Sequence, residues 1–346
     1  MTESNHFQDW DLSHWQYYHG KPEIGADFKS VPTDFIVTEK LGFELAGEGE
    51  NLFLLIEKEG LNTQQVCEYL AKFFGKRLRD IGYAGLKDKQ SVSRQWFSVQ
   101  MNVTQAVNLD GLNTEQIRLI EHTRHLRKLK VGALKGNHFS IRLRNVTHMA
   151  KLEQRLELIK NSQVPNYFGL QRFGFKGNNL NWANRMADGE QIRDKKIKGF
   201  ALSAARSFLF NEVVSERIKH QIFLAPQVGE AYILAGSNSY FSQQADDTIY
   251  RRLQQGDIQL SAPLFGDGDA IATGPVSVLE QNIMEQHQNW CDLLIENGLK
   301  QERRPISLIP GDMRWQKEEG NMVCVEFELP AGAFATSVLR ECVNFN

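Results

Sequence analysis

The sequence predicts an α+β protein in which a second, more helical domain interrupts a strand-rich one. The chain has 346 residues, more than one ordinary hydrophobic core usually organises. Alternating apolar and polar residues, the pattern of half-buried strands, occur in the first part of the chain and again near the C-terminus. Between them, after Pro165, longer stretches have helical character. An insertion is the simplest arrangement that gives two strand-rich ends around a helical middle.

Four segments before Pro165 have strand patterns and two have helix patterns. Strands are predicted at 34–39 and 52–57, joined by a glycine-containing turn at 46–49, and at 95–101 and 139–146. A helix is predicted from Asn62 or Thr63 to about Phe74, because its apolar residues fall on one face and Gly75 can end it. A second helix is predicted at 149–161. These elements form the strand-rich front of the chain.

The rest of the chain contains three helix-sized segments and one clear strand. Helices are predicted at 201–220, at 281–297 with Gly298 as the stop, and at 336–342. A strand is predicted at 323–329, where Val323, Val325, Phe327 and Leu329 alternate with polar residues and a cysteine. This late strand belongs with those of the front domain.

Composition excludes several classes of protein. Hydrophobic residues make up 41% and charged residues 24%, so wholesale disorder is excluded. The four cysteines are far apart in the sequence and have no metal-knuckle spacing, which indicates reduced thiols and no metal site. No apolar run approaches the roughly 20 residues of a membrane helix, and Met1–Trp10 lacks the core of a signal peptide. We therefore expect a cytoplasmic protein without membrane association.

Positive charge is concentrated in one segment although the net charge is only −2. Between Thr123 and Thr147 there is no Asp or Glu, and the cations are Arg124, Arg127, Lys128, Lys130, Lys135, Arg142 and Arg144. A local cationic patch on an acidic chain favours a specific phosphate-bearing partner. The alternative is a solvated helix face, but such faces normally mix the two signs of charge.

Several short motifs carry no function. The glycine pairs at 47 and 49 and at 266 and 268 lack the third glycine of a dinucleotide-binding loop. His122 and His125 have no second pair of ligands, so they indicate part of the basic segment rather than a zinc site. The acidic turn at 267–269 lacks the length and final Glu of a calcium loop.

The segment from Tyr83 to Gln95 stands out because Asp88 lies between two lysines in a glycine-bearing loop. Alone, it would indicate a charged turn. Together with 124–139, 165–174, 202–207, 329–341 and Tyr18–Pro22, it resembles the TruD family of tRNA pseudouridine synthases. The resemblance runs from about residue 17 to residue 345 in the family's order of motifs. Ser93 stands where the family often has Thr, the first dozen residues extend its usual start, and the chain ends earlier than many members.

The resemblance implies a fold and an activity. The fold is a circularly permuted pseudouridine-synthase-like sheet, mixed but mainly antiparallel, with flanking helices and an inserted α/β TRUD domain. The catalytic domain would comprise 1–162 and 309–346, and the insertion 163–308. The implied reaction isomerises uridine, with uridine 13 of tRNA as the family's bacterial target, and uses no cofactor. The implied partner is tRNA, and we expect a monomer because nothing in the sequence demands a dimer.

The resemblance also implies the site residues. The catalytic aspartate falls on Asp88, and the residues around the target uridine fall on Phe35, Asn137, Phe139 and Phe334. A nearby cation would balance the carboxylate; Lys29 is expected from the resemblance, as is a supporting role for Glu39. Lys87 and Lys89 are doubtful partners, since adjacent side chains of an extended loop point to opposite faces. By sequence alone, the position of Phe139 on the apolar face of its strand favours core packing.

Arginine, lysine and aromatic residues would contact the RNA. One set is Arg124, Arg127, Lys128 and Lys130; the other is Arg172, Lys176 and Arg206 in the insertion, interleaved with aromatic residues. Two alternatives use the same features: an RNA N-glycosidase, which would release uracil, and a non-catalytic RNA-binding protein or tRNA folding chaperone, which would tolerate loss of Asp88. A small-molecule enzyme would leave the acid-free basic segment unexplained.

Overall fold

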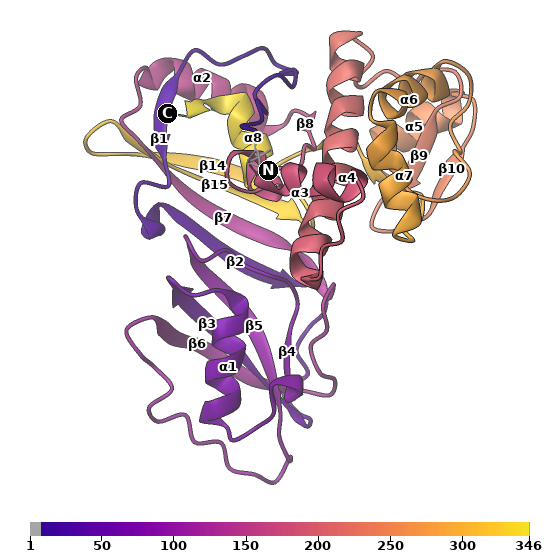
Figure 1. Ribbon diagram of the computed structural model, residues 1–346. Helices are drawn as coiled ribbons and strands as arrows, with labels where there is room; N and C mark the ends of the chain where they lie inside the picture. The colour runs from indigo at the N-terminus through magenta and orange to yellow at the C-terminus, as the bar shows by residue number, and fades with distance from the viewer. Residues whose placement is uncertain (1–7, 346) are drawn as a thin grey trace, which may run out of the picture. The chain divides into compact units, whose positions relative to one another are not determined.

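The computed structural model describes residues 8–345, and the backbone forms two compact units (Figure 1). Within the described residues, the sheet unit comprises Glu23–Asn161, Pro310–Gly332 and 342–345. The insertion unit comprises 8–22, Ser162–Ile309 and Ala333–Glu341. The predicted insertion, 163–308, lies within the insertion unit. Residues 8–22 and 333–341, which the prediction placed in the catalytic domain, group with it instead.

The sheet unit is built on one large mixed sheet, which confirms the predicted α+β class. The path through the sheet is β14-β15-β7-β2-β5-β3-β6; β1 and β4 pair with β7 and β5, and β16 pairs with β1. The strands are β1 (Gly25–Phe28), β2 (Phe35–Leu41), β3 (Asn51–Glu59), β4 (Ile81–Tyr83), β5 (Val92–Gln100), β6 (Ile117–His125), β7 (Leu134–Arg144), β14 (Gly311–Glu318), β15 (Met322–Pro330) and β16 (Asn344–Phe345). Two pairs, β2 with β5 and β1 with β16, are parallel and the others are antiparallel.

Helix α1 (Thr63–Phe73) forms where it is predicted, and it covers one face of this sheet. The Asn62 side chain accepts a hydrogen bond from the Gln65 N–H, and the Gln65 side chain accepts one from the Asn62 N–H. Two of the free N–H donors at the helix start are thereby satisfied. Val66 and Leu70 are fully buried against the apolar residues of β3 and β5. Gly75 follows the helix with φ of 61°, a conformation that glycine adopts without cost.

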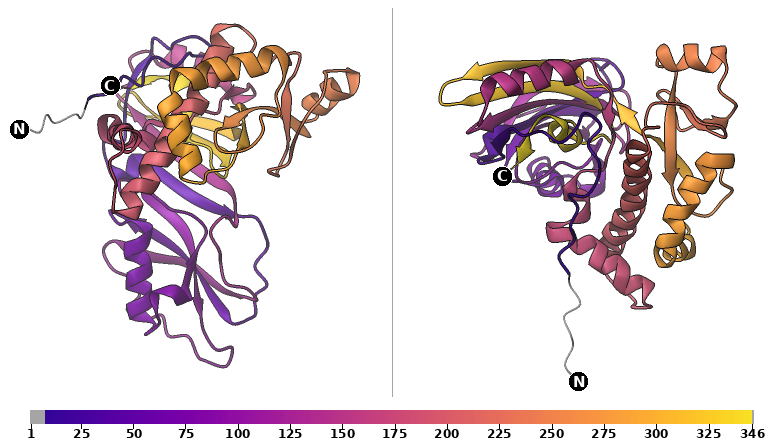
Figure 2. Two further views of the ribbon diagram at one scale, coloured as in Figure 1. Left: turned by 45° about the vertical axis from the view of Figure 1, so that its right-hand side comes forward. Right: turned by 90° about the horizontal axis from the view of Figure 1, so that it is seen from above.

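Helix α2 (Met149–Lys160) lies along the hairpin of β14 and β15, which is the long yellow pair in the right-hand view of Figure 2. Leu152, Leu156 and Ile159 are fully buried on its inner face. An ion pair of 2.8 Å joins Lys317 on β14 to Glu153 on the helix. The predicted helix at 149–161 and the predicted strand at 323–329 are thus confirmed, and they belong to the same unit.

The insertion unit combines six helices with two small sheets in the part of the chain that the structure describes. One sheet has the order β10-β9-β11-β12 and the other pairs β13 with β8. The helices are α3 (Asn178–Ala187), α4 (Lys195–Lys219), α5 (Asp247–Gln254), α6 (Gly274–Gln286), α7 (Gln288–Glu296) and α8 (Ala335–Cys342). The strands are β8 (Val164–Pro165), β9 (Ala231–Leu234), β10 (Tyr240–Ser242), β11 (Ile258–Leu264), β12 (Glu302–Pro305) and β13 (Ser307–Leu308).

Short 3-10 turns complete the chain, and the N-terminal segment is anchored by tryptophans. The turns are η1 (Pro32–Asp34), η2 (Leu78–Asp80), η3 (Leu170–Phe173) and η4 (Phe175–Gly177). In the N-terminal extension, residues 1–7 lie outside the described range. Beyond them, the Trp10 indole donates to Asn181 Oδ1 at 2.9 Å, and Trp15 is 3% exposed in the insertion-unit core. The described part of the extension therefore packs as part of that unit.

Two predicted elements differ in detail. The predicted helix at 281–297 is two helices, α6 and α7, that meet at His287. No glycine or proline marks the break; His287 instead leaves helical geometry while its ring stacks on Trp290 at 5.2 Å. The predicted strands at 34–39 and 52–57 are present as β2 and β3, but β5 lies between them in the sheet.

No described helix has both the length and the apolar character needed to cross a membrane.

Candidate active site

Two neighbouring strands of the sheet unit carry four of the predicted site residues on one face. Phe35 and Glu39 are on β2, and Asn137 and Phe139 are on β7. Glu39 pairs with Asn137 in the register, and Val37 pairs with Phe139. Because alternate residues of a strand and cross-strand partners share a face, all four side chains lie on the same side of the sheet.

Phe35 and Phe139 form an aromatic layer on this face. Their ring centroids are 5.8 Å apart, and Phe139 also lies 5.7 Å from Phe327 of β15. Phe35 is 7% exposed and Phe139 is 6% exposed. Both rings are therefore mostly packed into the sheet, as the strand pattern of Phe139 predicts, and what they offer to a ligand is their remaining edge.

The loop that carries Asp88 connects β4 to β5 and is held through its backbone. Gln95 Nε2 donates to the Gly85 carbonyl at 2.6 Å. The Lys87 N–H donates to Thr63 Oγ1 at 2.9 Å, which ties the loop to the start of α1. The Asp88 side chain itself is exposed. The loop is thus fixed on both sides of the carboxylate while the carboxylate faces outward.

The carbonyl of Asp88 receives two further hydrogen bonds. Lys58 Nζ donates to it at 3.0 Å and Ser91 Oγ donates to it at 3.1 Å. Lys58, on β3, is fully buried and also donates to the Leu61 carbonyl at 2.7 Å. Burial lowers the pKa of the Lys58 ammonium to about 8, and the negative charge of Asp88 opposes that fall. A buried cation therefore anchors the residue whose carboxylate is the predicted catalyst.

Lys29 is the second cation near Asp88. It follows β1 with φ of 59°, a left-handed conformation that costs energy for any residue with a Cβ. Its Nζ lies 4.0 Å from the centroid of the Phe35 ring. Burial lowers the pKa of Lys29, and the charge of Asp88 acts in the opposite direction. The negative charge of Asp88 therefore acts on Lys29 in the structure, and a catalytic role for the two residues stays a prediction.

Glu39 forms an ion pair with Lys87, which the sequence makes a doubtful cationic partner for Asp88. Lys87 Nζ lies 2.6 Å from Glu39 Oε1, and the two side chains are 8% and 0% exposed. The other Glu39 oxygen accepts the Trp96 N–H at 3.0 Å. Burial raises the pKa of Glu39, and Lys87 partly offsets that rise. The pair links β2 to the residue directly before Asp88.

Asn137 has an unsatisfied acceptor. Its Oδ1 is buried and has no hydrogen-bond partner among the described residues. A buried amide oxygen without a donor costs about 1–3 kcal/mol, so a ligand N–H at this position would recover that free energy. The amide group can both donate and accept, as the edge of a uracil base does.

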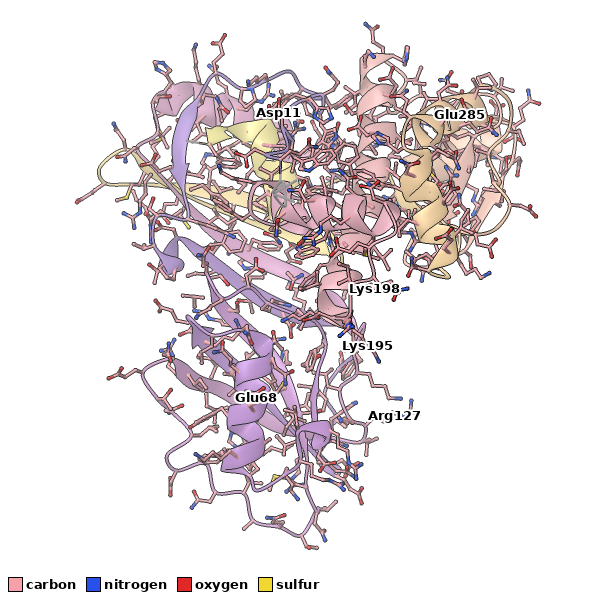
Figure 3. All side chains as sticks on the ribbon, in the orientation of Figure 1. Asp11, Glu68, Arg127, Lys195, Lys198 and Glu285 are labelled. Carbon is pink, nitrogen blue, oxygen red and sulfur yellow. The ribbon has the colours of Figure 1, made fainter. Side chains whose placement is uncertain are left out.

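The basic segment comprises the end of β6, the loop after it and β7, and it contains no helix. The Arg124 guanidinium donates to the carbonyls of Gly49 and Gln105, both at 3.1 Å, and Lys128 donates to the Arg79 carbonyl. Arg127 and Lys130 are exposed in the loop after β6, and Figure 3 shows the Arg127 side chain projecting from the ribbon. Two of the four predicted cations thus brace neighbouring loops, and two are available at the surface.

The remaining predicted residues belong to the insertion unit. Phe334, directly before α8, lies 5.6 Å from Phe168 and 5.5 Å from the Arg172 guanidinium carbon. Lys176 is exposed and pairs with Asp9 at 2.7 Å. Arg206 pairs with Glu302 at 3.2 Å and donates to main-chain carbonyls. Arg172 and Phe334 are therefore brought together, whereas Lys176 and Arg206 each have a carboxylate of their own.

Sequence reasoning missed Lys58. Lys58 follows the apolar run Leu52–Ile56 on a strand that is buried on both faces. Because the apolar residues do not alternate with polar ones, the sequence does not indicate on which face of the sheet the Lys58 side chain lies. A lysine continuing such a run is the one available signal. Within residues 8–345, no three His, Cys, Asp or Glu side chains gather as metal ligands would.

The chain is similar in sequence and in fold to known proteins. The family model described as tRNA pseudouridine synthase D (TruD) matches residues 12–190 and 183–342. A Pseudoalteromonas atlantica protein named tRNA pseudouridine synthase D is 46% identical over 339 residues, which cover 96% of this chain and 97% of that protein. One of the same name from Shewanella oneidensis is 42% identical over 335 residues, covering 96% and 90%. A solved Methanosarcina mazei structure described under that name superimposes with a TM-score of 0.73 at 20% identity, covering 95% of each chain.

Proposed function

Because the chain belongs to the tRNA pseudouridine synthase D (TruD) family, we propose that it converts uridine 13 of tRNA into pseudouridine with Asp88 as the essential carboxylate. The observation that carries the proposal is the Asp88 loop. Its backbone is anchored to α1, β3 and β5, and its carboxylate is exposed beside Lys29. Such a carboxylate is positioned before substrate arrives, which lowers the cost of reaching the reactive geometry.

The reaction breaks the bond from N1 of uracil to C1′ of the sugar and forms a bond from C5 to C1′. The proton on C5 is lost and N1 gains one, so the product is an isomer and no other reactant is consumed. Asp88 would act on the sugar or the base, or take a proton from the sugar. Lys29 would hold the negative charge of the carboxylate in place, with Phe35 beneath its ammonium group.

The target base must leave its stack to reach Asp88. The edges of Phe35 and Phe139 would support the base, and Asn137 Oδ1, which has no partner among the described residues, would accept the uracil N3–H. Glu39 would act through Lys87 by fixing the loop before Asp88. In the insertion unit, Phe334 would offer an aromatic face to the RNA.

Exposed and half-buried cations would supply phosphate contacts. In the sheet unit these are Arg127 and Lys130; Arg124 and Lys128 would act by shaping the loop that presents them. In the insertion unit Arg172 is the strongest candidate, and Lys176 and Arg206 would have to exchange their carboxylate partners for phosphate. The monomeric state and the cytoplasmic location remain predictions.

The test is to incubate the protein with unmodified tRNA transcript and map pseudouridine by carbodiimide-dependent stops of reverse transcription. We expect a stop at uridine 13, no stop when that uridine is replaced by cytidine, and no stop with Asp88→Asn. Asp110→Asn, which neutralises an exposed aspartate of the same unit, is the matched control and should retain activity. Normal turnover by folded Asp88→Asn would sink the proposal. Release of free uracil would indicate an N-glycosidase.

A further inference from the structure

The insertion unit contains two arginines gathered on one aromatic ring. The Arg304 guanidinium carbon lies 4.3 Å from the centroid of Phe168, and that of Arg172 lies 5.4 Å from the same centroid. Arg172 also lies 5.5 Å from Phe334. Arg304 is on β12, Arg172 is in η3, and Phe334 directly precedes α8. Three segments far apart in the sequence thus converge on one half-buried cluster.

The two positive charges repel each other at this place. Burial and the neighbouring charge of Arg172 lower the pKa of the Arg304 guanidinium to about 9. Burial lowers the pKa of Arg172 as well. Among the described residues, no carboxylate lies within ion-pair distance of Arg172, whose guanidinium donates to Ser203 Oγ at 2.8 Å. The Arg304 guanidinium donates to Asn166 Oδ1, a neutral acceptor, at 2.7 Å. Bringing like charges together in a partly buried place is unfavourable unless an anion joins them.

Two polar atoms beside the pair lack hydrogen-bond partners. Arg172 Nε and Thr336 Oγ1 are both buried and unsatisfied within the described part of the chain. Gly169 lies between them: its carbonyl accepts the Arg172 N–H at 2.9 Å, and a Cβ on it would lie 2.3 Å from Thr336 Oγ1. The missing side chain of Gly169 lets Thr336 approach. The cluster therefore holds spare donors of the kind that phosphate oxygens accept.

We propose that Arg172, Arg304 and Thr336 form a phosphate-binding subsite that holds an RNA phosphodiester next to the base lying against Phe334. This inference rests on the proposed RNA substrate. A planar guanidinium can hold two phosphate oxygens at once, and the adjacent aromatic ring can hold a base. One phosphate would neutralise the repulsion between the two arginines. The subsite contains Arg304 and Thr336, neither of which is among the site residues predicted from the sequence.

The test measures how tRNA affinity depends on salt concentration. Each phosphate contact contributes about 0.7–0.9 to the slope of log affinity against log salt. Arg172→Gln is therefore expected to flatten the slope by roughly that amount and to weaken binding about 5–10-fold at low salt. Arg304→Gln should behave alike, and Arg172→Lys should keep most of the slope because it keeps the charge.

Arg252→Gln is the matched control. Arg252 also lies over an aromatic ring, 5.4 Å from Phe241, in the same unit, but it pairs with Asp257 at 2.5 Å. Its loss should leave the slope unchanged. The melting temperature separates an effect on binding from an effect on folding. Relief of like-charge repulsion should leave Arg172→Gln at least as stable as the wild type. If Arg172 had only a structural role, its loss should lower the melting temperature.

Three outcomes would overturn the subsite: a wild-type salt slope in folded Arg172→Gln, an equal change in Arg252→Gln, or a lower melting temperature with unchanged binding. A rise in melting temperature with inorganic phosphate at constant ionic strength, without any change in the RNA slope on substitution, would indicate a free-anion site and would also overturn it. Failure of the wild type to form pseudouridine would remove the proposed activity, but it would leave these binding slopes interpretable.

Discussion

Replacing Lys58 by methionine tests whether a buried cation underlies the Asp88 loop. Burial lowers the pKa of this lysine from 10.5 to about 8, and each pKa unit corresponds to about 1.36 kcal/mol. The folded protein therefore bears a cost of about 3 kcal/mol for keeping the ammonium protonated. At neutral pH the loss of that cost in Lys58→Met offsets the loss of the Lys58 donor at the Leu61 carbonyl, which costs about 1–3 kcal/mol; the Asp88 carbonyl keeps the Ser91 hydroxyl as a donor. Stability at pH 7 should change little.

The pH dependence of stability is the sharper readout. Below pH 8 both the folded and the unfolded chain carry the proton on Lys58, and above 10.5 neither does. Between these values the unfolded chain binds more protons, so the free energy of unfolding rises with pH. For the wild type this contribution amounts to about 2–3 kcal/mol between pH 7 and 10. Lys58→Met lacks it.

Urea unfolding followed by circular dichroism at pH 7, 8, 9 and 10 measures this difference. All other groups are common to both proteins, so their titration cancels when the two curves are subtracted. Lys72→Met, which removes an exposed lysine of α1 in the same unit, controls for the loss of one positive charge. A wild-type minus Lys58→Met difference that stays constant from pH 7 to 10 would refute the reasoning.

Two further substitutions test the packing around the proposed sites. Lys87→Met leaves the Glu39 carboxylate buried without its cation and should lower the free energy of unfolding by about 3–5 kcal/mol. In urea unfolding, the double variant Lys87→Met with Glu39→Gln should recover most of the lost stability. No recovery in the double variant would argue against the ion pair. Gly169→Ala places a Cβ 2.3 Å from Thr336 Oγ1 and should cost about 1–3 kcal/mol in thermal unfolding. Adding Thr336→Ala should restore part of that loss, and additive effects would contradict the clash.

Local signals predicted most of the sheet unit. Asn62, Gly75 and the apolar positions between them lie within one helix length of each other, so the sequence could define α1 closely. The half-buried strands β7 and β15 show their alternation for the same reason. Neighbours in the sheet were not predictable, because β5 inserts between β2 and β3 by a parallel pairing that no turn specifies.

Interactions between distant residues limited the prediction of the site. The resemblance supplied Asp88, Lys29 and Asn137, but it did not supply Lys58, whose bond to the Asp88 carbonyl spans 30 residues. It assigned Glu39 a supporting role without its partner, Lys87. The break between α6 and α7 at His287 was not predictable either. A ring contact with Trp290 accompanies this break, and no helix-breaking residue marks it.

The acid-free basic segment shows why a local charge count overstates a binding surface. Arg142 pairs with Glu318 at 2.5 Å and Arg144 pairs with Asp34 at 2.7 Å, so acids from elsewhere in the chain neutralise two of its cations. Arg124 and Lys128 are occupied by carbonyls. The charges that can take part in counterion release are those that fold without a partner. By that criterion, Arg127 in the loop after β6 and the half-buried Arg172 in the insertion unit are comparable, although only Arg127 lies in a basic run. The salt slope of each single variant, rather than its position in a charged segment, therefore decides which cations bind RNA.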